Sequence, residues 1–216
     1  MTIAEERAIE RLPVNEAFAR LPSHEAIERT AEALRAHRFV VHVVNTGAEA
    51  RDLVMGLIPE GSEVGQGASE TLETIGVTEA LRDGRFVAVR DRTRQMDRAT
   101  QGREIRKLAA APDVQINSAH AVTEAGQIVI ASNTGSQLGP IASGAGKVIL
   151  VIGAQKIVPN LDEAFRRVRE YNLPIEDAKF QRDFGRRSAV NKMLVISGEF
   201  LPDRTTVIIV RESVGV

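Results

Sequence analysis

Short apolar runs alternate with amphipathic stretches along most of the chain. The apolar runs, rich in β-branched residues, lie at residues 39–44, 63–64, 86–89, 114–116, 127–131 and 147–152. Runs of this kind, bounded by turn-forming residues, predict buried strands. The stretches at residues 23–37, 48–57, 70–75, 99–110 and 161–170 predict helices, with Ser23 and Asn160 as N-caps. Residues 192–197 and 205–211 predict two closing strands whose spacing suits a hairpin-like pair.

The alternation of strands and helices predicts an α/β fold. We expect a three-layer α/β/α arrangement with a mostly parallel sheet and antiparallel strands at the C-terminal end. No internal repeat or linker divides the chain, so residues 23–216 are expected to form a single domain. Residues 1–22 are charged and interrupted by Pro13 and Pro22, which predicts a helical arm over that domain. The charged segment 176–190 is expected to be a solvated loop or a surface helix.

The loops that follow three of the predicted strands are rich in small and polar residues. They lie at residues 65–69, 118–124 and 132–136. In a parallel sheet these loops share the edge formed by the carboxyl ends of the strands, where ligands usually bind. Small residues let backbone N–H groups approach an anionic or hydroxylated ligand closely. We therefore expect the site between the turn at 65–69 and the stretch at 114–159.

Composition excludes several classes of function. The 216 residues include 28 basic and 29 acidic side chains, and this net charge of −1 gives no electrostatic footprint for nucleic acid. Aromatic residues make up 4% with no Trp, which argues against base-stacking surfaces. The absence of Cys excludes iron–sulfur clusters and thiolate zinc sites held by this chain. No apolar run is long enough to span a membrane and no secretory signal is present, so a cytoplasmic location is expected.

Familiar ligand-binding motifs are incomplete in this sequence. The GQGASE stretch at residues 65–70 resembles a dinucleotide fingerprint, but Glu70 stands in place of its third Gly. The SGAGK stretch at 143–147 lacks the first Gly of a phosphate-binding loop and leads into a strand rather than a helix. The four His, at positions 24, 37, 42 and 120, show no metal-ligand spacing, so no metal site is expected.

Four motifs in one order resemble the LUD-domain family, the lactate utilisation domain. They are GASETLETIG at residues 67–76, AVTEAG at 121–126, SNTG at 132–135 and VIGAQKIVP at 151–159. The resemblance covers about residues 23–216. It implies a fold similar to the sugar-phosphate isomerase and CoA-transferase superfamily, and a link to bacterial lactate oxidation beside iron–sulfur or flavin partner proteins.

The candidate site residues come from these loops and motifs. His120 and Glu124 are candidates for proton transfer, because the imidazole of His120 and the carboxylate of Glu124 can take or give protons. The candidates for ligand binding are Gly65, Gly67, Ser69, Thr123, Asn133, Thr134, Gly135, Ser136, Gly153 and Lys156. Several have structural alternatives: Ser69 as a helix cap, His120 as a hydrogen-bonded loop residue, Glu124 as a turn residue and Lys156 as a solvated side chain at a strand exit.

Three functions remain open from the sequence. The first is binding of a small anionic metabolite in lactate or related organic-acid utilisation. The second is a non-catalytic assembly subunit of a lactate-oxidising redox complex, and the third is an isomerase- or transferase-like enzyme that uses His120 and Glu124. The cofactor is undetermined, and self-association into a homo-oligomer is compatible with all three.

Overall fold

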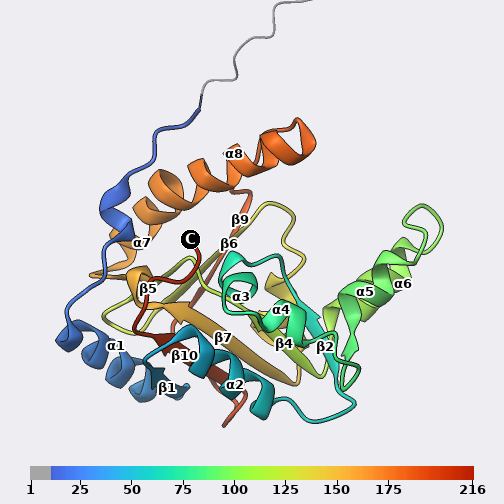
Figure 1. Cartoon of the computed structure of the whole chain (residues 1–216), viewed down its shortest axis with the longest axis horizontal. Helices are drawn as coiled ribbons and strands as arrows, with labels where there is room; N and C mark the ends of the chain where they lie inside the picture. Colours follow the sequence, from blue (N-terminus) through green and yellow to red (C-terminus); the bar gives the residue numbers. More distant parts are fainter. Residues whose placement is uncertain (1–10) are drawn as a thin grey trace, which may run out of the picture.

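A six-stranded parallel sheet forms the centre of the computed structural model, which describes residues 11–216 (Figure 1). The strands lie in the order β1-β10-β7-β4-β2-β3, and every neighbouring pair is parallel. Their bounds are β1 Val40–Val44, β2 Glu63–Gln66, β3 Val87–Ala88, β4 Val114–Asn117, β7 Lys147–Gly153 and β10 Thr205–Val210. Their carboxyl ends therefore share one edge of the sheet.

The central strand β7 is apolar along its length because both of its faces are covered. Val148, Leu150 and Ile152 point into one core, whereas Ile149 and Val151 point into the other. Successive side chains of a strand alternate between faces, so a buried parallel strand needs apolar residues at both parities. This explains the continuous apolar run in the sequence.

Helices cover one face of this sheet, and a helix together with a second sheet covers the other. Helices α2 (Gly47–Leu57), α3 (Glu70–Thr74) and α4 (Val77–Ala80) share with the strands the core that contains Ile149 and Val151. Helix α1 (His24–Ala36) packs on the opposite face through Ile27, Ala31 and Leu34. Ser23 caps α1 as predicted, because its Oγ accepts a hydrogen bond from the N–H of Ala26 at 3.2 Å.

The second sheet has four strands in the order β8-β5-β6-β9. Their bounds are β5 Ala121–Thr123, β6 Ile128–Ser132, β8 Ile157–Val158 and β9 Lys192–Ile196. Strand β6 is antiparallel to both β5 and β9, and β5 is parallel to β8. The outer face of this sheet packs on helix α7 (Leu161–Arg167) through Ala164.

The predicted fold class is confirmed: the molecule is an α/β protein with a mostly parallel sheet flanked by helices and additional antiparallel strands. The predicted hairpin-like pairing of the last two strands is wrong. Strand β10 lies between β1 and β7 in the large sheet, whereas β9 pairs with β6 in the small one. The reason is burial, since β10 is buried at every residue and belongs in a sheet centre, whereas β9 is only half-buried and occupies an edge.

The charged segment 176–190 begins in a helix that continues from α7. A π-helical turn at Val168–Asn172 joins α7 to α8, which spans Leu173–Phe184 and ends at Gly185 with φ 63°. Of the loop or surface helix expected for this segment, the structure has a helix as far as Phe184 and irregular chain beyond it. Pro174 is at the start of α8, and the wider turn before it accommodates a residue that has no N–H.

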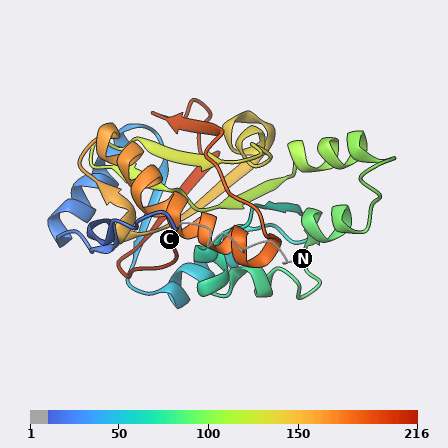
Figure 2. The same cartoon turned by 90° about the horizontal axis from the view of Figure 1, so that it is seen from above.

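Two helices project from the body of the molecule beside β2 and β3, as Figure 2 shows. They are α5 (Val89–Arg94) and α6 (Gly102–Ala110), and α6 has no buried residue. The strand predicted at 86–89 is reduced to β3, because Val89 already belongs to α5.

The remaining short elements are η1 at Glu16–Ala19, the π-helical turn η2 at Pro140–Gly144 and η3 at Ala154–Lys156. Of the predicted arm, residues 1–10 lie outside the described residues, and residues 11–22 contain only the short turn η1. Between residues 11 and 216, no helix combines the length and apolar character that a membrane span requires.

Candidate functional site

A cavity of about 320 Å³ lies at the carboxyl edge of the large sheet. The turn before α3 forms one wall, the segments that flank β5 and β6 form a second, and α8 with the chain after it forms a third. Of the residues predicted from the sequence, the cavity brings together Gly67, Ser69, His120, Asn133, Thr134, Ser136 and Lys156. The turn at 65–69 and the stretch at 114–159 thus face one another across it.

Five predicted site residues do not line this cavity. Glu124 forms an ion pair with Arg29 of α1, with 2.9 Å between Nη2 and Oε2. The structure therefore does not bring Glu124 together with His120. Thr123 is buried and its Oγ1 accepts a hydrogen bond from the N–H of Gln127 at 3.0 Å, which holds the turn between β5 and β6.

The other three are glycines with packing or backbone roles. A Cβ atom at Gly153 would lie 2.2 Å from Gln155 Oε1, so the position needs Gly for packing. Gly135 has φ 83°, in the left-handed region, and turns the chain after β6. Gly65 lines a separate, smaller cavity of about 110 Å³ beside α5.

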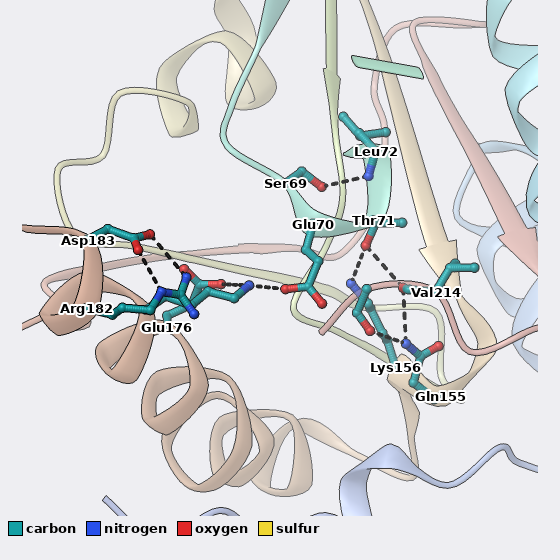
Figure 3. Close-up of polar contacts among 12 residues, drawn as sticks. Ser69, Glu70, Thr71, Leu72, Gln155, Lys156, Glu176, Arg182, Asp183 and Val214 are labelled. Carbon is teal, nitrogen blue, oxygen red and sulfur yellow. Dashed lines mark hydrogen bonds and ion pairs between the residues drawn. The ribbon is translucent and has the colours of Figure 1, made fainter. Parts of the chain in front are cut away.

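Lys156 is the cation of the main cavity and is only 1% exposed. Its Nζ donates hydrogen bonds to Thr71 Oγ1 at 2.8 Å and to Ser118 Oγ at 3.1 Å (Figure 3). Burial, followed by the charge of Arg167, lowers the pKa of Lys156 to about 7, although Glu70 and Glu176 act in the opposite direction. Both the ammonium and the neutral amine are therefore populated at neutral pH. The alternative of a solvated lysine does not fit its burial.

His120, another residue that lines the cavity, is fixed in one neutral tautomer. Its Nδ1 accepts a hydrogen bond from the backbone N–H of Ala131 at 3.1 Å, so the ring proton lies on Nε2. Burial, the charge of Lys156 and the charge of Arg167 together lower the pKa of His120 to about 3. The imidazole is therefore a hydrogen-bond donor to a ligand at neutral pH and not an imidazolium acid.

Arg167 stands behind the wall of the cavity and is fully buried. Its Nη1 donates to the carbonyl oxygen of His120 and to Asn172 Oδ1, and its guanidinium stacks on the Tyr171 ring. Burial lowers the pKa of Arg167 to about 10, so it remains charged at neutral pH. Its contact with the His120 carbonyl links this charge to the position of the imidazole.

The short helix α3 forms the wall that faces His120. Ser69 caps it, because its Oγ accepts from the N–H of Leu72 at 3.4 Å (Figure 3), and Ser69 also lines the cavity. Glu70, the first residue of α3, forms an ion pair with Lys179 of α8. This pair ties α3 to α8 across the opening of the site.

The segment after α8 completes the cavity. Ser188 and Val190 are among its lining residues. The segment is held by the buried carboxylate of Asp177, which accepts from the N–H of Ser188 at 2.7 Å and pairs with Arg187 at 2.8 Å. The charged stretch thus has a defined place in the site in addition to its solvated surface.

Three residues of the site were missed in the sequence. Thr71 is not among the predicted site residues, although it lies inside the first family motif and its hydroxyl contacts Lys156. Ser118 lay within a candidate loop but was not singled out. Arg167 carries a detectable signal, because it occupies a buried position of α7 three residues after Ala164, where an apolar residue would be expected.

Donor groups suited to metal binding are not gathered in the described part of the chain: residues 11–216 contain no cluster of three or more His, Asp or Glu. The cavity instead presents one lysine, one neutral imidazole, the two carboxylates of Glu70 and Glu176, and several hydroxyl and amide groups. This set suits a small ligand that carries carboxylate or hydroxyl oxygens.

Comparisons with known proteins agree with this architecture. The crystal structure of a DUF162 family protein from Deinococcus radiodurans is similar over 92% of this chain and 99% of its own, with a TM-score of 0.54. The two sequences are 12% identical, so this likeness concerns the fold. No functionally curated protein matches the chain in sequence. Residues 27–210 match the family model described as the LUD domain, which spans most of the chain, and the protein therefore belongs to the LUD domain family.

Proposed function

We propose that this LUD-domain protein binds a small anionic metabolite, an organic acid that carries a hydroxyl or carbonyl group, in the cavity beside Lys156. We place this binding in the utilisation of lactate or related organic acids, in keeping with the family. One observation carries the proposal. Lys156 and Arg167 are two buried cations near each other, and neither has a carboxylate within ion-pair distance among residues 11–216.

Buried charges are normally paired, because removing an ion from water is costly. At an effective dielectric constant of about 20, a carboxylate about 4 Å from an ammonium contributes on the order of 4 kcal/mol. One pKa unit corresponds to about 1.4 kcal/mol, so such an anion would raise the pKa of Lys156 and favour its protonated form. A bound organic acid therefore supplies the charge that the protein leaves unmatched.

The polar groups opposite Lys156 suit the remaining oxygens of such an acid. His120 offers Nε2–H, and the Asn133 and Thr134 side chains line the same cavity. A hydroxyl or carbonyl oxygen next to the carboxylate can accept from these donors. The volume of about 320 Å³ limits the ligand to a small molecule.

Isothermal titration calorimetry with lactate, pyruvate and a sugar phosphate tests the proposal. We expect saturable binding of at least one organic acid, lost in Lys156→Met. Lys147→Met is the matched control, because Lys147 is exposed at the start of β7, whereas Lys156 lies in η3 beyond the other end of that strand. Failure of every small anion to bind at millimolar concentration would contradict the proposal.

A specific observation also favours the alternative role as an assembly subunit of a redox complex. The projecting segment 89–110, which contains α5 and α6, carries seven basic and three acidic side chains. A basic projection suits a partner with an acidic surface, such as an iron–sulfur or flavin protein. Co-purification of such a partner with the wild type, and its loss in Arg98→Glu/Arg103→Glu, would support this role. Retention of the partner by the double variant would contradict it.

A further inference from the structure

The hydrogen bonds of Lys156 match a neutral amine better than an ammonium. Its Nζ has two acceptors, Thr71 Oγ1 at 2.8 Å and Ser118 Oγ at 3.1 Å, and no third one within residues 11–216. An ammonium has three N–H donors, whereas a neutral amine has two and a lone pair. With the two hydroxyls occupied, the fourth tetrahedral position of Nζ is unused by the protein.

The two hydroxyls are themselves oriented as acceptors toward Lys156. The Thr71 hydroxyl is within donating distance of the Val214 carbonyl oxygen at 3.2 Å and of Ser118 Oγ at 3.3 Å. The Ser118 hydroxyl can donate to the carbonyl oxygen of Ala119 at 3.3 Å. Each hydroxyl therefore has an acceptor other than Nζ for its proton, which leaves its oxygen able to accept from Lys156.

The setting of Lys156 also keeps a large fraction of it unprotonated. Burial and the nearby charge of Arg167 lower the pKa of Lys156 to about 7, from the ordinary value of 10.5. An ordinary lysine is neutral in roughly one molecule in a thousand near pH 7.4, whereas at this pKa more than half of the amines carry a free lone pair. Amines in this condition are effective nucleophiles toward carbonyl groups.

We propose that Lys156 is a nucleophile that forms an imine with the carbonyl carbon of a small oxo acid bound in the cavity. This inference rests on the proposed function, because the same cavity first has to bind the acid. It narrows the ligand class from organic acids in general to those that carry an aldehyde or ketone group. His120 supplies the second requirement, since its Nε2–H can donate to the carbonyl oxygen and polarise it.

The reaction is balanced without any further reagent. The Nζ lone pair forms the C–N bond while the carbonyl π pair moves to oxygen, and one proton passes from nitrogen to oxygen to give a carbinolamine. The hydroxyl then leaves with the second N–H proton as water, and the C=N bond forms. Amine and carbonyl thus yield imine and water, with no change of oxidation state.

Reductive trapping on the full chain tests this inference. The protein is incubated with pyruvate or glyoxylate and then treated with sodium cyanoborohydride, which reduces an imine to a stable secondary amine. We expect one adduct per chain by intact mass spectrometry, located at Lys156 by peptide mapping. Lys156→Arg should form none. Lys147→Arg, which removes an exposed lysine at the start of β7 that does not line the cavity, should form it at the wild-type rate.

Binding of lactate by the wild type separates this inference from the proposed function. Lactate has no carbonyl besides its carboxylate, so it can bind but cannot form the imine. Lactate binding without any trapped oxo acid would overturn the imine while leaving anion binding intact. Absence of both would overturn both proposals. Adducts spread over surface lysines, at equal levels in Lys156→Arg, would also overturn the assignment, and the mapping on wild type makes this result independent of how the variant folds.

Discussion

The backbone N–H of Ala131 donates a hydrogen bond to Nδ1 of His120 at 3.1 Å, and this single contact decides which ring nitrogen carries the proton. Because the donor is a backbone group of strand β6, it cannot rotate to accept instead. The imidazole is thereby held as the Nε2–H tautomer and works as a neutral donor. The sequence suggested proton transfer for this residue, and its surroundings favour polarisation of an oxygen instead.

Titration of His120 is the first prediction. Its pKa is lowered to about 3, so the ring should remain neutral in NMR spectra from pH 8 down to about pH 5. In the unfolded chain the same ring takes up a proton near pH 6.5. The unfolded state therefore binds more protons between these values, and stability should fall as the pH drops from about 6.5 toward 3. His120→Asn should flatten this part of the stability curve. A ring that titrates near pH 6.5 in the folded protein would contradict the assignment.

Lys156→Met should make the unliganded protein more stable at pH 6. The lysine is buried without a carboxylate partner, and its pKa is about 7 when folded and 10.5 when unfolded. Between about pH 7 and pH 10.5 the unfolded state therefore binds one more proton at this lysine than the folded state does. The stability of the wild type consequently rises with pH over this range. The advantage of the variant should shrink above pH 7. Urea unfolding at pH 6 and pH 9 measures the stability difference between the variant and the wild type. An equal difference at the two pH values would refute the explanation.

The affinity for an organic acid should depend on pH in the opposite sense. An anion binds the ammonium form of Lys156, which is depleted above its pKa of about 7. The dissociation constant for lactate should therefore increase up to about tenfold per pH unit above pH 7. Calorimetry in two buffers of different ionisation enthalpy should also detect proton uptake on binding. An affinity that stays constant from pH 6 to pH 9 would exclude Lys156 as the main anion contact.

Thr71→Val should weaken the site, whereas Thr74→Val should not. Thr71 is buried and its hydroxyl contacts both Lys156 and the Val214 carbonyl oxygen, whereas Thr74 is exposed on the same short helix. Loss of a buried hydrogen-bonding group costs about 1–3 kcal/mol of stability. The variant should also lower the pKa of Lys156 further, because an acceptor for the ammonium is removed. Chemical modification rates of Lys156 against pH measure this shift, and similar profiles for the two variants would contradict it.

Glu124→Gln should leave ligand binding unchanged. Glu124 is outside the cavity and pairs with Arg29, whose side chain is more than half exposed. An exposed ion pair of this kind contributes about 0–1 kcal/mol. Thermal unfolding and lactate titration of the variant check both statements. A large loss of affinity would restore Glu124 to the site.

Gly126→Ala should be far more damaging than Gly185→Ala. Both glycines have positive φ, 81° and 63°, so each substitution carries the strain of the left-handed region, about 1–2 kcal/mol. At Gly126 the new Cβ would also lie 2.8 Å from the carbonyl carbon of Ala33 in α1, whereas nothing lies within 4 Å at Gly185. Denaturant unfolding of the two variants should differ by roughly 1–3 kcal/mol, the usual range for overpacking. Equal losses of stability in the two variants would contradict this prediction, because α1 would then move to accommodate the new Cβ without cost.

Local features of the fold were predictable because they depend on nearby residues. Ser23 and Ser69 cap helices as their side chains and positions indicate, and the apolar run at 147–152 is the central strand. Pairing of distant strands was not predictable in the same way. Strands β9 and β10 are adjacent in sequence, but they differ in burial and belong to different sheets. The hairpin-like pairing predicted for them is therefore absent.

The same distinction between local and long-range features applies to the candidate site. Loops at the carboxyl edge of the sheet could be recognised as a group, because topology alone places them there. The direction of each side chain within a loop could not. Thr123 and Glu124 follow the cavity residue His120 closely in sequence but do not line the cavity. Arg167, more than forty residues after His120, instead contacts the carbonyl oxygen of His120 from helix α7.

The short turn η3 has a mechanical consequence for the chemistry of the site. It joins the last residue of β7 in the large sheet directly to β8 in the small one, and Lys156 is its final residue. Ser118 and His120 lie on the other short crossover, between β4 and β5. The amine and its partners are therefore carried on two parallel bridges between the sheets. The apolar core between the sheets holds these two connections in place relative to one another. A mutation that shifts this core would therefore change the pKa of Lys156 even if it altered no residue that lines the cavity.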